Sequence, residues 1–128
     1  MGLYLVRSAG PARVGDIVVA WLPEDARRVA SSRRYLPAAV PLVKRVAAVA
    51  GDRVCARSAA LFVNGRAMAV RRRRDPSGRR LSWWWGCDLL QPGDLLLLST
   101  APEAFDGRYF GITHPPQVIG SARLIWAA

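Results

Sequence analysis

The chain has 128 residues and a formal charge of +10, because nineteen basic side chains outnumber nine acidic ones. Hydrophobic residues make up 52% of the sequence and charged residues 22%, which excludes a disordered chain and predicts one domain, 1–128, with its own core. No apolar run approaches the roughly 18 residues that cross a bilayer, and the first residues lack a signal-peptide pattern. We therefore expect residues 1–128 to be soluble, and the basic excess first suggests nucleic acid or an anionic membrane as partner.

Turn signals divide the chain into short apolar runs, which are typical of β-strands. Gly-Asp pairs precede three of these runs, and each pair predicts a turn because Gly adopts unusual backbone angles and Asp bonds its own backbone. In chain order the predicted strands are 17–19, 40–49, 53–55, 61–63, 66–70, 95–98 and 117–126. The clearest pair is 61–63 and 66–70, since Asn64-Gly65 between them is typical of a type I′ hairpin turn.

One helix is predicted, over residues 23–35, between the first two strands. Glu24 and Asp25 lie in its first turn, and Arg33 and Arg34 in its last, as the helix dipole favours. Short strands with so little helix predict a mainly β fold, either a barrel or a sandwich.

The basic residues are unevenly divided, because eighteen are Arg and only one, Lys44, is Lys. Arg stays protonated in proteins, whereas a buried Lys can lose its proton and act as a base. Lys44 is therefore either a functional residue or the remainder of a composition biased toward Arg.

The densest charge run is 71–80, and Trp83-Trp84-Trp85 follows it. A nucleic-acid patch here would neutralise phosphates and stack bases on the tryptophans. No recognised nucleic-acid signature surrounds the run, so we interpret it as a solvated loop, with the tryptophans partly in the core. A further interpretation places the loop against anionic lipid headgroups.

The cysteines and the histidine do not indicate a metal site. The chain has Cys55, Cys87 and His114, but no CxxC motif and no second ligand beside the histidine, which we interpret as a loop residue. We expect no metal and no cofactor. The two cysteines form either one disulfide, closing a loop of about 30 residues, or two independent buried thiols.

Four blocks, taken in order, resemble the type I signal peptidase family of serine proteases over nearly the whole chain. They are Gly2-Leu3-Tyr4, Gly15-Asp16-Ile17-Val18, Val43-Lys44-Arg45-Val46 followed by Gly51-Asp52, and Phe105-Asp106-Gly107-Arg108-Tyr109-Phe110-Gly111. The resemblance implies a signal-peptidase/LexA-like β-barrel-type catalytic domain with one short helix. The cysteines, with Trp85-Gly86-Cys87, and the stretch 118–120 are similar to the TraF-like branch of conjugative transfer peptidases. That branch has a periplasmic catalytic domain with such a cysteine pair, which implies a disulfide between Cys55 and Cys87.

The family mechanism is a Ser-Lys dyad, and the resemblance makes Lys44 the general base. A Lys can take a serine proton near neutral pH only when apolar surroundings lower its pKa, and Lys44 lies within the apolar run 40–49. Asp106 and Arg108 match the family's supporting pair, which would hold the strand that carries the base. Substrate-binding residues are expected at Pro41, Leu42 and Val43, beside an extended peptide.

The nucleophile is expected outside this sequence. In the family a Ser-x-Pro-x-Gly stretch precedes the Leu-Tyr that here is Leu3-Tyr4, which places the serine three residues upstream of Met1. We therefore expect residues 1–128 to lack both the nucleophile and an N-terminal membrane anchor, and to be inactive by the family mechanism. Ser8 lacks that setting and is interpreted as a turn residue. The chain also departs from the family at Ala104 and Gly107, where many members have Ser.

The implied function is that of a membrane-anchored endopeptidase at the bacterial inner membrane, with its catalytic domain on the periplasmic side. Its substrate would be a pilin-like or exported transfer protein, bound as an extended strand and cleaved or cyclised. LexA-like self-cleaving repressors share the dyad but not the cysteine pair or the block at 106–111. The alternative from another class is a non-catalytic basic β-barrel that binds nucleic acid or peptide, although we expect no nucleic-acid partner.

Overall fold

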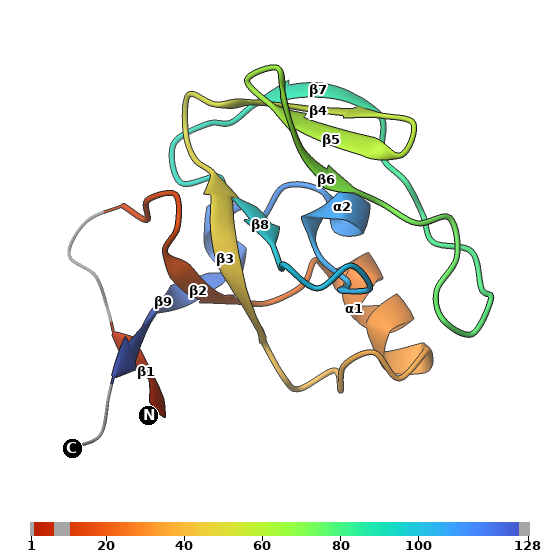
Figure 1. Ribbon diagram of the computed structural model, residues 1–128. Coiled ribbons are helices and arrows are strands. Elements are labelled where there is room, and N and C mark those ends of the chain that lie inside the picture. Colours follow the sequence, from red (N-terminus) through yellow and green to blue (C-terminus); the bar gives the residue numbers. More distant parts are fainter. Residues whose placement is uncertain (1, 7–10, 126–128) are drawn as a thin grey trace.

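The computed structural model describes residues 2–6 and 11–125, which form two antiparallel sheets (Figure 1). The five-stranded sheet has the order β1 (Gly2–Val6), β9 (Val118–Ile125), β2 (Ile17–Ala20), β3 (Leu42–Ala48) and β8 (Leu96–Leu98). The four-stranded sheet has the order β6 (Arg66–Val70), β5 (Ala60–Val63), β4 (Arg53–Arg57) and β7 (Gly86–Leu89). The helices are α1 (Glu24–Ser32), the short α2 (Gly107–Phe110) and the 3-10 turn η1 (Pro115–Gln117).

The mainly β fold predicted from the sequence is confirmed, and of the helices in the described residues only α1 is longer than a single turn. Neither sheet closes into a barrel within residues 2–6 and 11–125, because each sheet ends in two edge strands. None of the helices in this part of the chain is long and apolar enough to span a bilayer.

Strand β8 connects the two sheets through their cores. All three of its residues are buried, so its alternating side chains point into different apolar clusters. Leu96 and Leu98 pack in a cluster with residues of β4 and β5, whereas Leu97 packs with residues of β2 and β3. A third, smaller cluster places α1 against the start of β3 through Leu22, Ala30 and Leu42. Strand β8, which pairs with β3, is therefore packed on both of its faces.

The predicted hairpin is confirmed as β5 and β6. Asn64 and Gly65 both have positive φ, 51° and 82°, as a type I′ turn requires. The Asn64 side chain also accepts from the Arg53 amide and donates to Asp52, which ties the hairpin turn to the start of β4.

The helix ends earlier than the sequence predicts. It stops at Ser32, and Arg34 adopts a φ of 61°, which ends the helical conformation. Arg33 and Arg34 therefore do not lie in the last turn, and the Arg33 side chain extends instead to Tyr35 and the carbonyl of Arg80. The Arg33 side chain is therefore held by contacts outside the helix.

Four elements were not predicted, namely β1, β7, α2 and the 3-10 turn η1. All four residues of β7 are exposed, so the strand carries no alternating apolar pattern that a sequence could reveal. It is located instead by its pairing with β4, in which Cys55 lies directly opposite Cys87. The structure contains the disulfide between them, and of the two alternatives left by the sequence the disulfide is the correct one.

Removal of this disulfide is expected to destabilise the protein. The bridge joins residues 32 positions apart, and closure of a loop of that size contributes about 3–4 kcal/mol through the entropy of the unfolded chain. A Cys55→Ser, Cys87→Ser double variant should lose about that much free energy of unfolding in urea titrations. A reductant should lower the stability of the wild type but not of the double variant, and equal wild-type curves with and without reductant would contradict the expectation.

Candidate active site

A pocket of about 420 Å³ opens beside the N-terminal half of β3. Its remaining walls come from the segment after α1, the segment that follows β6, and the loop before α2. The apolar lining residues are Leu36, Pro41, Leu42, Val43, Pro76, Leu81, Ala104 and Phe105. The polar lining residues are Tyr35, Lys44, Arg72, Arg74, Asp75, Glu103 and Tyr109. The structure therefore brings together in one pocket the expected base, Lys44, and the expected substrate-binding residues before it.

Lys44 lies half-buried on β3, opposite Val18 of β2. Burial lowers the pKa of its amine, the Asp106 carboxylate opposes this shift, and the Arg108 guanidinium adds to it. Among residues 11–122 no group hydrogen-bonds the Lys44 ammonium or pairs with it. Arg45, on the other face of the strand, is exposed and donates to the Gly15 carbonyl. The one titratable amine of the strand thus faces the pocket.

Beside the pocket, one edge of β3 has no strand partner among the described strands. Strand β2 pairs with β3 from Leu42 to Arg45, whereas β8 pairs with it only from Arg45 onward. On the side of β8, Leu42, Val43 and Lys44 therefore have no strand partner among the described strands. An extended peptide could add to this edge by main-chain hydrogen bonds, with its side chains entering the pocket.

Asp106 and Arg108 lie behind the pocket and hold one of its walls. The Asp106 carboxylate, completely buried, accepts from the amides of Ser99 (2.9 Å) and Arg108 (3.0 Å) and so caps α2. The Arg108 guanidinium, 3.6 Å from that carboxylate, donates to the carbonyls of Ser99, Ala101 and Pro102. Burial raises the pKa of Asp106, and these amides, Arg108 and Lys44 oppose the rise. Among residues 11–122, the side-chain hydrogen bonds that the pair makes outside itself go to residues 99–102, in the loop that carries Ala104 into the pocket.

The family difference at Gly107 has a packing reason. A Cβ at this position would lie 2.7 Å from Leu96 Cδ1 and 2.9 Å from the Leu97 carbonyl oxygen. Any side chain at 107 would therefore have to displace β8. Ala104, the other difference, lines the pocket with a methyl group and offers no hydroxyl to Lys44.

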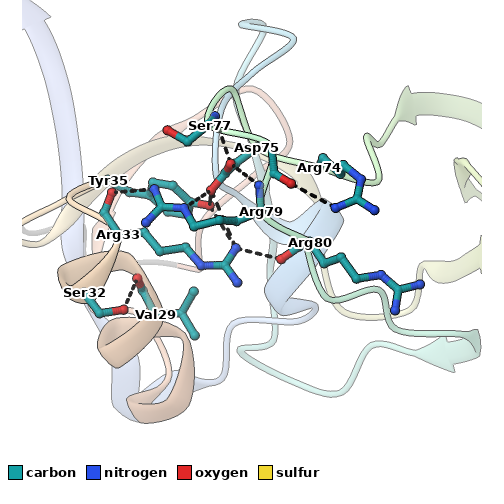
Figure 2. Close-up of polar contacts among 10 residues, drawn as sticks. Val29, Ser32, Arg33, Tyr35, Arg74, Asp75, Ser77, Arg79 and Arg80 are labelled. Carbon is teal, nitrogen blue, oxygen red and sulfur yellow. Dashed lines mark hydrogen bonds and ion pairs between the residues drawn. The ribbon is translucent and has the colours of Figure 1, made fainter.

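The opposite wall is organised by Asp75, which the sequence analysis did not single out (Figure 2). Tyr35 donates to its carboxylate at 2.6 Å, and the amides of Ser77 and Arg79 and the Arg79 side chain also donate to it. Arg33 lies 3.7 Å away and bonds the Arg80 carbonyl, so the segment 71–80 is fastened to the end of α1. The hydrogen bond from Tyr35 is the main cause that lowers the pKa of Asp75 to about 2.

The arginine run is thus not a freely solvated loop along its whole length. Arg71 is 2% exposed and donates to the carbonyls of Ser58 and Trp84. Its guanidinium lies 4.4 Å from the Trp83 ring centre and 5.2 Å from that of Trp85. These are cation–π distances, so two of the tryptophans contact arginine of their own chain.

The other residues considered from the sequence are not among those that line the pocket. His114 is exposed and pairs with Asp94 at 2.8 Å. Ser8 lies outside the described residues, and Gly2 to Tyr4 belong to β1, which pairs with β9. No cluster of three or more potential metal ligands occurs within the described part of the chain.

Comparison with known proteins assigns the family. The family described as signal peptidase, peptidase S26, matches residues 2–127, and the chain belongs to this family. A solved structure of a signal peptidase I from Enterococcus faecalis V583 is similar, with 19% identity and a TM-score of 0.48 over 89% of this chain and 98% of that one. A search of curated proteins finds no match.

The pKa of Lys44 can be measured directly because the chain has one lysine. In protein labelled with ¹³C-lysine, the Cε resonance should titrate below the ordinary value of 10.5 in the folded state and return toward it in urea. Asp106→Asn should lower the pKa further, since the carboxylate favours the charged amine. An ordinary pKa in the folded protein would contradict the burial of the amine.

Asp75 should make the protein sensitive to acid. Its folded pKa of about 2 lies below the ordinary value of 3.8, so its contribution to stability is complete above 3.8 and is lost as the pH falls through about 2. Melting temperatures should therefore fall more steeply over this pH window in the wild type than in Asp75→Asn. Asp25→Asn, in an exposed ion pair on α1, should behave like the wild type, and identical slopes for all three proteins would contradict the role of Asp75.

Proposed function

We propose that residues 1–128 form the catalytic domain of a Ser-Lys endopeptidase in which Lys44 is the general base. Membership of the signal peptidase family supports a serine protease of this type. The observation that carries the assignment of Lys44 is its place in the pocket. The only lysine of the chain has a pKa lowered by burial and lines a pocket beside an unpaired strand edge.

The proposed chemistry requires a neutral Lys44 amine, and the lowering of its pKa by burial favours that form. Unprotonated Lys44 would accept the proton of a serine hydroxyl as the serine oxygen attacks the substrate carbonyl. The resulting ammonium would then return the proton to the leaving amine as the peptide bond breaks. Water would release the acyl group in the same way, whereas attack by another amine would join two chain ends. The serine, by the resemblance, precedes Gly2, so residues 1–128 alone are proposed to be inactive.

The proposed substrate is a polypeptide bound in extended form along Leu42 to Lys44. Small side chains next to the cleaved bond would suit a pocket walled by Pro41, Leu42 and Val43. A pilin-like or exported transfer protein is the substrate class that the TraF-like resemblance implies.

The proposed location is the periplasmic face of the inner membrane, with an anchor preceding the domain. The disulfide between Cys55 and Cys87 supports this location, because disulfides persist in oxidising compartments such as the periplasm. The exposed arginines of 71–80 would suit a domain that works beside anionic lipid.

The function is tested by supplying the missing nucleophile. A chain with Ser-Ala-Pro added before Met1 should cleave extended peptides that have small residues at the cut, as detected by mass spectrometry. The same chain with Ala-Ala-Pro, and residues 1–128 alone, should not. Lys44→Met in the Ser-Ala-Pro chain should reduce the rate by about 100-fold or more, since general-base catalysis contributes on this order.

Arg45→Met is the matched control, because it removes the neighbouring cation on the opposite face of β3. Cleavage by residues 1–128 that depends on Lys44, or full activity of Lys44→Met in the extended chain, would contradict the mechanism. Absence of cleavage with tight, steeply salt-dependent binding of single-stranded nucleic acid would favour the basic binding module instead.

A further inference from the structure

The run Arg71 to Arg74 divides into two pairs that face opposite ways. Arg71 and Arg73 lie against the Trp83 ring, with their guanidinium carbons 4.4 and 4.9 Å from its centre. Arg72 and Arg74 line the pocket that contains Lys44. Alternation of this kind is expected of extended backbone, and Arg74 forms an isolated antiparallel bridge with Arg80.

The two arginines of the pocket are available to a ligand. Arg74 is exposed; it donates to the carbonyl of Gly78 within its own loop, and no carboxylate among residues 11–122 lies within ion-pair distance of it. Arg72 contacts Glu103 at 3.4 Å, but both side chains are more than half exposed. Exposed pairs of this kind contribute little, so a competing carboxylate could replace Glu103 at small cost.

The backbone that carries Arg72 and Arg74 is held in place by hydrogen bonds to other parts of the protein. Asp75, the next residue, is held by the four hydrogen bonds described above, and the amide of Arg72 donates to the Tyr109 hydroxyl. Backbone on both sides of Arg74 is thus fastened to the body of the protein, which reduces the entropy lost when its side chain binds a ligand.

We propose that this pocket selects extended polypeptides that carry an acidic side chain close to the small residues of the cleavage site, and that Arg74, assisted by Arg72, binds the carboxylate. A guanidinium can bind a carboxylate through two parallel hydrogen bonds, which makes this recognition specific. The inference rests on the proposed peptidase function, since it names the substrate class of the same pocket.

The test is peptide binding, which requires no nucleophile. Short fluorescein-labelled peptides of Ala, Thr and Val, identical except that Glu, Gln or Lys is moved through each position, are titrated with the wild-type protein by fluorescence anisotropy. At one position the Glu peptide should bind about tenfold more tightly than its Gln counterpart, with the Lys peptide weakest. Arg74→Gln should abolish this preference, whereas Glu103→Gln should increase it because Arg72 becomes free.

Arg73→Gln is the matched control, because it removes the same charge from the same loop but on the tryptophan side. It should retain the preference for Glu. Equal binding of Glu and Gln peptides by a protein whose serine-extended form cleaves them would overturn this inference and leave the proposed function intact. Selective binding of the Glu peptide, together with no cleavage of that peptide by the serine-extended form, would support the inference and contradict the proposed function.

A second arm of the experiment separates peptide recognition from lipid binding. Wild-type protein and the variants Arg72→Gln, Arg73→Gln and Arg74→Gln are compared on phosphatidylglycerol vesicles and on the Glu peptide. Loss of peptide preference confined to the two pocket positions supports the proposal. Equal losses in all three variants, together with equally reduced vesicle binding, would overturn it in favour of a loop that faces lipid.

Discussion

The candidate site depends on one buried carboxylate, that of Asp106. A charge without access to water is stable only when it is paired and hydrogen-bonded, and here two backbone amides and Arg108 meet that requirement. Arg108 in turn binds three carbonyls of the loop 99–102. These hydrogen bonds hold the loop in the conformation in which Ala104 lines the pocket together with the start of β3.

A second carboxylate, that of Asp75, holds the other loop that lines the pocket. Its pKa is shifted in the opposite direction from that of Asp106. Asp75 is surrounded by donors and stays ionised to about pH 2, whereas burial raises the pKa of Asp106. Each carboxylate holds a loop that contains little regular structure, and both loops line the pocket together with the start of β3. The pocket is consequently built from chain segments that meet only in the folded protein, with Lys44 on strand β3, which pairs with β2 and β8.

Residues with local signals could be found before the structure was known. Asn64-Gly65 predicts its hairpin because positive φ angles are a property of those two residues, and Lys44 stands out because it is the only lysine. The strand β7 could not be found, since its exposed residues show no alternation. Helix α2 could not be found either, because four residues become helical through the cap that Asp106 provides.

The amino-acid sequence was sufficient for the mainly β class, for most strands and for the family blocks, and it singles out Lys44 as its one lysine. These are properties of short segments, so they can be recognised without knowledge of the tertiary structure. It could not show that Arg71 is buried while Arg74 faces the pocket, or that Asp75 fastens its loop to α1. The arginines of this run have identical side chains and differ only in the distant groups that surround them. Those groups determine whether each arginine is buried and what it pairs with. Tertiary packing therefore decided how a run of like charges is divided between core, surface and site.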